Sequence, residues 1–249
     1  MTMHPRLQKA FEQSRVLKVI SGLNNFDANR VAAIVKAAER GGATFVDIAA
    51  DPDLVKLVKE LTNLPVCVSA VEANQFVKAT QAGADLIEIG NFDSFYAQGR
   101  RFEAEEVLAL TQETRSLLPE ITLSVTVPHI LTLDQQVQLA EELVQAGADI
   151  IQTEGGTSST PRSAGTLGLV EKASPTLAAA YEISRAVSVP VLCASGLSNV
   201  TVPMAIAAGA AGVGVGSAIN QLDNEVAMIA AVRSLVEALA TVSPVRVHV

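Results

Sequence analysis

Three charged residues, Lys18, Asp47 and Glu88, lie within short apolar segments of the sequence. Such segments predict buried strands, where an unpaired charge is costly, so these residues are candidates for one shared site. An amine and two carboxyl groups suit acid/base catalysis, and burial would lower the pKa of Lys18 toward that of a Schiff-base amine. A purely structural ion-pair network would use the same residues. The sequence leaves both interpretations open.

His129 is the fourth candidate catalytic residue. It is the only histidine away from the two ends of the chain, and it directly follows an apolar segment that predicts a strand. A histidine at the end of a strand is a candidate general acid. A surface or capping role is the alternative. Cys67 and Cys193 lie within apolar segments and are predicted to be buried, unreactive thiols. The spacing of the His, Cys and Asp residues predicts no metal site.

Two stretches of small residues, Cys193–Asn199 and Gly212–Ala218, are candidates for binding phosphate. Small residues let backbone N–H groups approach an anion, and a helix that begins just after such a stretch adds its dipole. Plain tight turns are the alternative. The residues that we expect to contact the phosphate are Ser195, Gly196, Gly214, Gly216 and Ser217.

The segment Glu154–Gly168 is long, polar and rich in glycine. Loops of more than about 12–15 residues in a compact domain are usually functional or disordered, so we interpret this one as a lid or a ligand-binding backbone, with a merely mobile loop as the alternative. Its hydroxyl groups could contact a polar ligand, and Arg162 could bind an acid. The candidate ligand-binding residues are Gln152, Glu154, Gly155, Gly156 and Thr157.

A second segment, Gly90–Arg101, is similar but contains more aromatic residues. Phe92, Phe95 and Tyr96 could form the wall of a ligand site or simply anchor the segment. The sequence does not distinguish these roles.

Four segments repeat one pattern, in which a glycine ends a helical stretch and a short apolar run follows. Glycine adopts a positive φ cheaply at the end of a helix, so Gly42, Gly83, Gly147 and Gly209 mark turns from helix to strand. Other apolar runs lie between these units. Together they predict eight strands, at residues 16–21, 44–49, 65–70, 85–90, 121–127, 149–154, 190–195 and 211–216.

Strands that alternate with helices in this way predict an α/β fold, a (β/α)8 TIM barrel, and the 249 residues match the ~250 that such a barrel needs. A doubly wound open sheet is the alternative. We expect one domain over residues 1–249, with an amphipathic helix in Met1–Arg15 that caps the floor of the barrel. The predicted helices include Asp27–Arg40, Glu103–Leu118 and Asp134–Ala146, with Asp27 and Asp134 as N-caps.

Aligned on their glycines, the repeats place Asp47, Glu88, Gln152 and Gly214 at the same offset. Interior side chains of a barrel stack in layers of four drawn from alternate strands, so these positions predict one layer with a gap at Gly214. The outer face of each strand lies under helices, so the charges should face the barrel axis. The same argument holds for Lys18.

The composition excludes several classes of partner. The net charge is −8 and no cluster of basic residues exceeds Arg100–Arg101, so neither nucleic acid nor an anionic membrane is an expected partner. Residues 186–222 carry no charge, but Pro and Gly divide them into pieces too short to span a bilayer. The start of the chain is charged and predicts no signal peptide. Two cysteines indicate a reducing, cytoplasmic compartment.

Three motifs, Lys18–Asp27, Ile89–Asp93 and Thr153–Thr157, together resemble a family of conserved hypothetical TIM-barrel proteins from cyanobacteria and from red-algal or plant plastids. The resemblance covers nearly the whole chain. It implies a barrel of the phosphate-binding superfamily, and the plastid stroma as the location of a plastid homologue. It supplies no catalytic residues.

More distant similarities point to different chemistries. The ends of the last two strands are similar to those of tryptophan synthase α-type and thiazole synthase-type barrels, whereas Ala146–Gly156 resembles FMN-dependent nitronate monooxygenases. Three hypotheses follow: a lyase, isomerase or aldol-type enzyme acting on a phosphorylated metabolite, an FMN-dependent oxidoreductase, and a non-catalytic ligand-binding or regulatory barrel. In each case the chain could form a homo-oligomer.

Overall fold

The computed structural model describes residues 3–155 and 160–242. Its eight strands are β1 (Val16–Gly22), β2 (Phe45–Ala49), β3 (Val66–Ala70), β4 (Leu86–Ile89), β5 (Thr122–Val127), β6 (Ile150–Thr153), β7 (Val191–Ala194) and β8 (Gly212–Val215). Its helices are α1 (Pro5–Glu12), α2 (Ala28–Gly41), α3 (Pro52–Leu61), α4 (Ala73–Gln81), α5 (Asp93–Tyr96), α6 (Ala104–Leu117), α7 (Leu133–Gln145), α8 (Gly165–Ala186), α9 (Val202–Ala207), α10 (Ser217–Asn220) and α11 (Glu225–Ala240).

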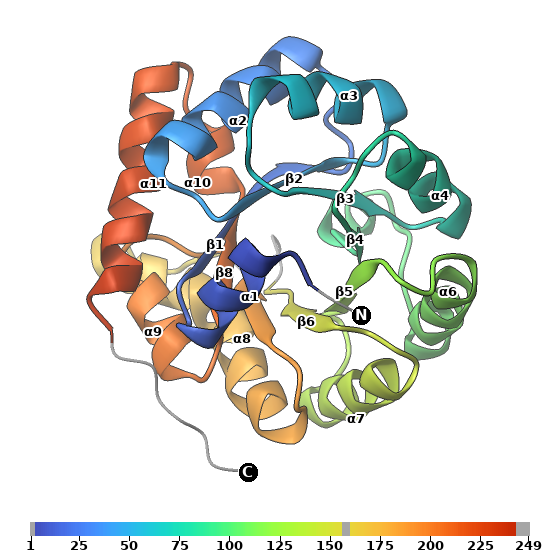
Figure 1. Ribbon diagram of the computed structural model, residues 1–249. Coiled ribbons are helices and arrows are strands. Elements are labelled where there is room, and N and C mark those ends of the chain that lie inside the picture. The colour runs from blue at the N-terminus through green and yellow to red at the C-terminus, as the bar shows by residue number, and fades with distance from the viewer. Residues whose placement is uncertain (1–2, 156–159, 243–249) are drawn as a thin grey trace.

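The strands form a closed parallel barrel in the order in which they occur along the chain. Each strand pairs with the next, and β8 pairs with β1 through partners such as Lys18 and Gly214. This closure confirms the (β/α)8 barrel and excludes the open sheet. Figure 1 shows the larger helices as a ring around the strands. Within the described residues, no helix is both long enough and apolar enough to cross a membrane.

The repeated glycines have the backbone conformation that the sequence predicts. Their φ angles are 92° at Gly42, 111° at Gly83, 100° at Gly147 and 105° at Gly209, all in the left-handed region. A residue with a side chain is strained there, whereas glycine is not. Each of these four turns ends a helix and leads directly into the next strand. The strands begin within about one residue of the predicted positions.

One of the two predicted N-caps is correct. The Asp27 side chain accepts hydrogen bonds from the backbone N–H groups of Asn29 and Arg30 at the start of α2. The prediction for Asp134 is wrong, because α7 begins one residue earlier and Thr132 is its N-cap. The Gln135 side chain accepts a hydrogen bond from the Thr132 backbone N–H at 3.1 Å, which forms the capping box of this helix.

The floor of the barrel is closed by α1, which lies across the barrel opening that faces the viewer in Figure 1. Leu7 and Phe11 of this helix are buried. They pack against the lowest interior layer, which consists of Val16, Phe45, Cys67, Leu86, Ile150 and Leu192. The predicted capping helix is therefore present. It covers the end of the barrel at which the strands begin.

Candidate functional site

A buried layer of charged and polar side chains crosses the barrel interior. The Nζ atom of Lys18 lies 2.6 Å from Oε2 of Glu88 and 4.0 Å from Oδ1 of Asp47. It also donates a hydrogen bond to Oε1 of Gln152 at 3.1 Å. The side chains of Lys18, Asp47 and Glu88 are completely buried. The fold thus brings Gln152 together with Lys18, Asp47 and Glu88, as the predicted interior layer requires.

Neutral groups complete this network. The Ser69 hydroxyl donates to Asp47 at 2.6 Å, and the Ser124 hydroxyl donates to Glu88 at 2.8 Å. The Gln152 amide donates to Glu88 at 2.8 Å. A Cβ atom at Gly214 would lie only 2.9 Å from Cβ of Ala194, so the barrel has no room for a side chain at this fourth position.

The network holds Lys18 in its charged form. Burial lowers the pKa of Lys18, but the carboxylates of Asp47 and Glu88 outweigh this effect and raise the pKa above its usual value. Burial raises the pKa of Asp47 to about 6, against the opposing effect of Lys18. A nucleophilic amine must be deprotonated, so this environment disfavours the Schiff-base role that burial alone suggested.

A cavity of about 710 Å³ opens at the carboxyl ends of the strands. Gln152, Thr126 and Asn91 line it. Gln152 also contacts Lys18 and Glu88, and the Asn91 side chain donates to Asp47 at 3.4 Å. These uncharged residues separate the cavity from the buried charges. The predicted catalytic residues Lys18, Asp47 and Glu88 therefore reach the cavity only through neighbours.

The predicted phosphate-binding residues all line this cavity, on the side formed by the ends of β7 and β8. They are Ser195, Gly196, Gly214, Gly216 and Ser217. Within residues 3–155 and 160–242, the backbone N–H groups of Gly196, Leu197 and Ser217 donate to no protein oxygen. Gly196 has a φ of 70°, and a Cβ atom there would lie 2.7 Å from the carbonyl oxygen of Lys172.

Two further residues of the cavity were not found from the sequence. Lys172 of α8 is the only Lys or Arg among the described lining residues. Asn220 of α10 donates through Nδ2 to the carbonyl oxygens of Ile20 and Ser21, at 3.0 and 3.2 Å. Its Oδ1 is buried and accepts no hydrogen bond from the described part of the chain. Neither residue lies in a recognisable motif, so no sequence signal identified them.

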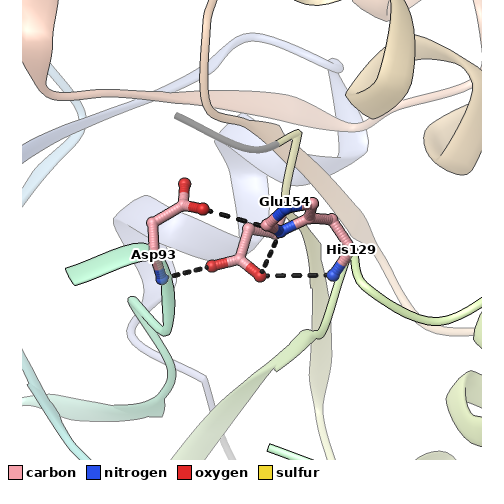
Figure 2. A group of neighbouring side chains, drawn as sticks. All are labelled: Asp93, His129 and Glu154. Carbon is pink, nitrogen blue, oxygen red and sulfur yellow. Dashed lines mark hydrogen bonds and ion pairs between the residues drawn. The ribbon is translucent and has the colours of Figure 1, made fainter. Parts of the chain in front are cut away.

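A second cluster of ionisable groups stands at the same end of the barrel (Figure 2). Asp93 begins α5 after β4, His129 follows β5, and Glu154 follows β6. Nδ1 of His129 lies 3.1 Å from Oε2 of Glu154 and 3.5 Å from Oδ1 of Asp93. Asp93 and Glu154 line the cavity. The predicted His129 is thus placed beside a predicted ligand-binding residue, and Asp93 joins them.

Glu154 connects the three loops that carry this cluster. Its oxygens accept hydrogen bonds from the backbone N–H of Asp93 at 2.8 Å, the backbone N–H of His129 at 3.2 Å and the Tyr96 hydroxyl at 3.1 Å. Burial lowers the pKa of His129, but the hydrogen bond and charge of Glu154, together with Asp93, raise it above its usual value. Burial and Glu154 also raise the pKa of Tyr96.

The aromatic segment after β4 is mainly an anchor. Phe92 is buried and stacks on Phe102, with ring centroids 4.4 Å apart, and Phe95 meets the same ring edge-on at 5.4 Å. Tyr96 contacts the imidazole of His129 with centroids 5.0 Å apart. These contacts fix the loop that presents Asp93 to the cavity.

The long loop after β6 is described only at its ends. Gly155 packs closely on α8, since a Cβ atom there would lie 2.8 Å from Cβ of Thr176. The predicted ligand-binding residues Gly156 and Thr157 lie outside the described residues. The backbone N–H of Arg162 donates to Glu171 of α8 at 2.7 Å.

The two cysteines are buried and carry free thiols, as the sequence predicts. Burial, reinforced by Asp47, raises the pKa of Cys67 well above its usual value. Burial likewise raises the pKa of Cys193 to about 11. Both thiols are therefore protonated at neutral pH.

The chain belongs to the family described as "Protein of unknown function (DUF561)", whose model matches residues 3–244. A relative from Pyropia yezoensis, named "Uncharacterized protein ycf23", is 38% identical over 239 residues, which are 96% of this chain and 88% of the relative. The protein of the same name from Cyanophora paradoxa is 47% identical over 197 residues, 79% of this chain and 81% of the relative. The resemblance seen in the three motifs is confirmed.

Two solved structures show the same fold as this chain but share little sequence with it. Thiamine phosphate pyrophosphorylase from Pyrococcus furiosus has a TM-score of 0.61 at 16% identity, over 92% of this chain and 97% of that one. (S)-3-O-geranylgeranylglyceryl phosphate synthase from Thermoplasma acidophilum, in complex with its substrate sn-glycerol-1-phosphate, has a TM-score of 0.62 at 16% identity, over 97% and 99% of the two chains. At these identities the likeness shows the barrel fold.

Proposed function

We propose that this member of the family binds a phosphorylated small metabolite in the cavity at the carboxyl ends of its strands, with the phosphate against the ends of β7 and β8. The observation that carries the proposal is the set of backbone N–H groups at Gly196, Leu197 and Ser217, which line the cavity and have no acceptor in the described chain. Such groups can converge on an anion, and barrels often hold phosphate at this position. Lys172 adds a positive charge to the same cavity.

The rest of the lining favours a ligand rich in hydroxyl groups. The described lining residues include no aromatic side chain, but they do include six carboxamides: Asn24, Asn25, Asn91, Gln152, Asn220 and Gln221. Oδ1 of Asn220 is a buried acceptor that no donor within residues 3–155 and 160–242 reaches. Leaving such a group unsatisfied costs about 1–3 kcal/mol, and a hydroxyl of the ligand would satisfy it. We therefore favour a phosphorylated polyol or sugar acid over the flat ring system of FMN.

The reaction that we propose is of the lyase, isomerase or aldol type. The reacting end of the metabolite would lie against Asp93 and Glu154, which carry the carboxyl groups among the described lining residues. Lys18 is protonated and screened from the cavity, so it acts in this scheme only through Gln152. The phosphate would hold one end of the metabolite, and the carboxyl groups would face the carbon atoms at the other end.

A ligand-binding barrel without catalysis is the second candidate. The complete burial of Lys18, Asp47 and Glu88 favours it, because buried ion-pair networks also occur where their role is purely structural. Native mass spectrometry of the purified protein distinguishes the candidates. A co-purifying phosphorylated compound that is converted on incubation indicates an enzyme, one that is released unchanged indicates a binding protein, and bound flavin indicates the oxidoreductase.

The phosphate site is tested by calorimetric titration with inorganic phosphate and with glycerol phosphate. We expect Ser217→Asp to abolish binding, because it adds a negative charge beside the uncommitted N–H groups at an exposed position that tolerates it. Ser188→Asp is the matched control, since Ser188 is exposed and precedes β7 at the other end of the barrel. Equal affinity in the wild type and Ser217→Asp would contradict the proposed site.

A further inference from the structure

We propose that Asp93, His129 and Glu154 form a binding site for a divalent metal ion, with Oδ1, Nδ1 and Oε2 as the respective ligand atoms. The three side chains come from three consecutive strand-to-helix loops and meet at the edge of the cavity (Figure 2). One ligand atom from each lies within 4.8 Å of the other two. The metal site depends only on the geometry of these three residues, whereas the role of the ion described below rests on the proposed function.

The distances within the cluster suit a shared ion. Metals of this kind bind nitrogen and oxygen ligands at about 2.0–2.2 Å, so neighbouring ligand atoms are about 3.0–3.6 Å apart. Nδ1 of His129 is 3.1 Å from Oε2 of Glu154 and 3.5 Å from Oδ1 of Asp93. An ion at the centre would need only a small adjustment of the carboxyl groups.

The ligands are also held in place by their surroundings, as ligands of metal sites usually are. Glu154 is only 4% exposed, and its oxygens are fixed by the backbone N–H of Asp93 and the Tyr96 hydroxyl. The second oxygen of Asp93 accepts a hydrogen bond from the Ser195 hydroxyl at 3.2 Å. Ser195 belongs to the proposed phosphate site, so the two sites share a wall.

The mixture of ligands indicates which ions would bind. An imidazole nitrogen favours transition metals over Mg²⁺ and Ca²⁺, whereas two carboxylates suit Mn²⁺. We therefore expect Mn²⁺, Fe²⁺ or Zn²⁺. Three protein ligands leave coordination positions open, and two of the three ligand residues line the cavity. An oxygen of the phosphorylated ligand could occupy such a position, where the ion would polarise a carbonyl group for the proposed reaction.

The experiment measures metal binding by the full chain in phosphate-free buffer. Protein stripped with EDTA is dialysed against Zn²⁺ or Mn²⁺, the bound metal is quantified, and Mn²⁺ binding is followed by electron paramagnetic resonance. We expect one saturable ion per chain. Asp93→Asn removes a charged ligand with little change of shape, and His129→Phe keeps a ring beside Tyr96 but removes the nitrogen. Each should weaken binding at least tenfold.

Glu106→Gln is the matched control, because this exposed carboxylate lies on the nearby helix α6 and pairs with Arg100 instead. It should bind the ion as the wild type does. Absence of saturable binding in the wild type, or wild-type affinity in a folded Asp93→Asn protein, would overturn the proposal. Phosphate binding is measured separately in EDTA, so a protein that binds phosphate but no metal contradicts only the metal site.

Discussion

At the scale of single residues, the barrel interior shows how buried charges are made tolerable. Lys18 meets two carboxylates, and each carboxylate also accepts a hydrogen bond from a serine, Ser69 for Asp47 and Ser124 for Glu88. Removing one member of such a network is expensive, because its partners remain buried without compensation. This property distinguishes the network from the many ion pairs on the surface, which contribute little.

We predict that Lys18→Met strongly destabilises the protein. The substitution leaves the carboxylates of Asp47 and Glu88 buried without a cation, which costs about 3–5 kcal/mol in other buried pairs. The free energy of unfolding in guanidinium chloride measures the effect. Lys56→Met is the control, because Lys56 pairs with Asp53 on the surface, where their side chains are 64% and 93% exposed, and it should unfold like the wild type. Equal stability of the two variants would contradict a tightly coupled interior network.

A second prediction concerns pH. The pKa of Asp47 is raised from 3.8 to about 6 in the folded protein, so the folded state holds this proton more tightly than the unfolded chain does. The stability from this difference is present at low pH and is lost as the pH rises through about 6. Relative to Asp47→Asn, the free energy of unfolding of the wild type should therefore fall as the pH rises from 3.8 to about 6. A difference in stability between the wild type and Asp47→Asn that stays flat with pH would refute the raised pKa of Asp47.

At the scale of elements, the two ends of the barrel have separate tasks. The helix α1 inserts Leu7 and Phe11 into the floor, among the first interior residues of the strands. At the other end, Glu154 links the loops after β4, β5 and β6 through hydrogen bonds to Asp93, Tyr96 and His129. The closed floor stabilises the barrel, whereas the linked loops shape the cavity.

We predict that Leu7→Ala lowers stability without affecting the cavity. Leu7 is 1% exposed, and replacing such a core leucine by alanine costs about 2–5 kcal/mol. Phosphate and metal binding should keep their wild-type affinities below the unfolding transition, because the cavity lies at the opposite end of the strands. Chemical denaturation and calorimetry on the same samples measure both properties. Loss of binding in a folded Leu7→Ala protein would show that the two ends are coupled.

At the scale of the whole molecule, closure of the barrel creates the site. The cavity is lined by segments that follow β1, β4, β6, β7 and β8. The strands β6, β7, β8 and β1 are consecutive neighbours in the sheet, whereas β4 pairs with none of them. The side of the cavity that we propose to bind phosphate and the side that carries Asp93 therefore face each other only because the sheet closes on itself. A small ligand can then touch residues from distant parts of the chain.

The sequence by itself determined the barrel, because the signals for it are local. Each glycine turn and each apolar run is set by neighbouring residues, and the repeat places Asp47, Glu88 and Gln152 in one interior layer. The shared location of the two loops proposed to bind phosphate follows from the same repeat, since the ends of the last two strands must lie at one end of the barrel. The fold, the floor helix and the place of the cavity were thus predictable.

Only the tertiary structure decided which groups face the cavity and which are sealed beneath it. Lys18 and Gln152 are 134 residues apart in the chain, yet their hydrogen bond shields the buried charges. Asp93, His129 and Glu154 likewise meet from three loops whose spacing resembles no metal motif. Side-chain contacts across a closed barrel depend on strand register and on how far each side chain extends. A repeat in the sequence specifies the layer of a residue. It does not specify which side chains pair with that residue or whether the residue faces the cavity.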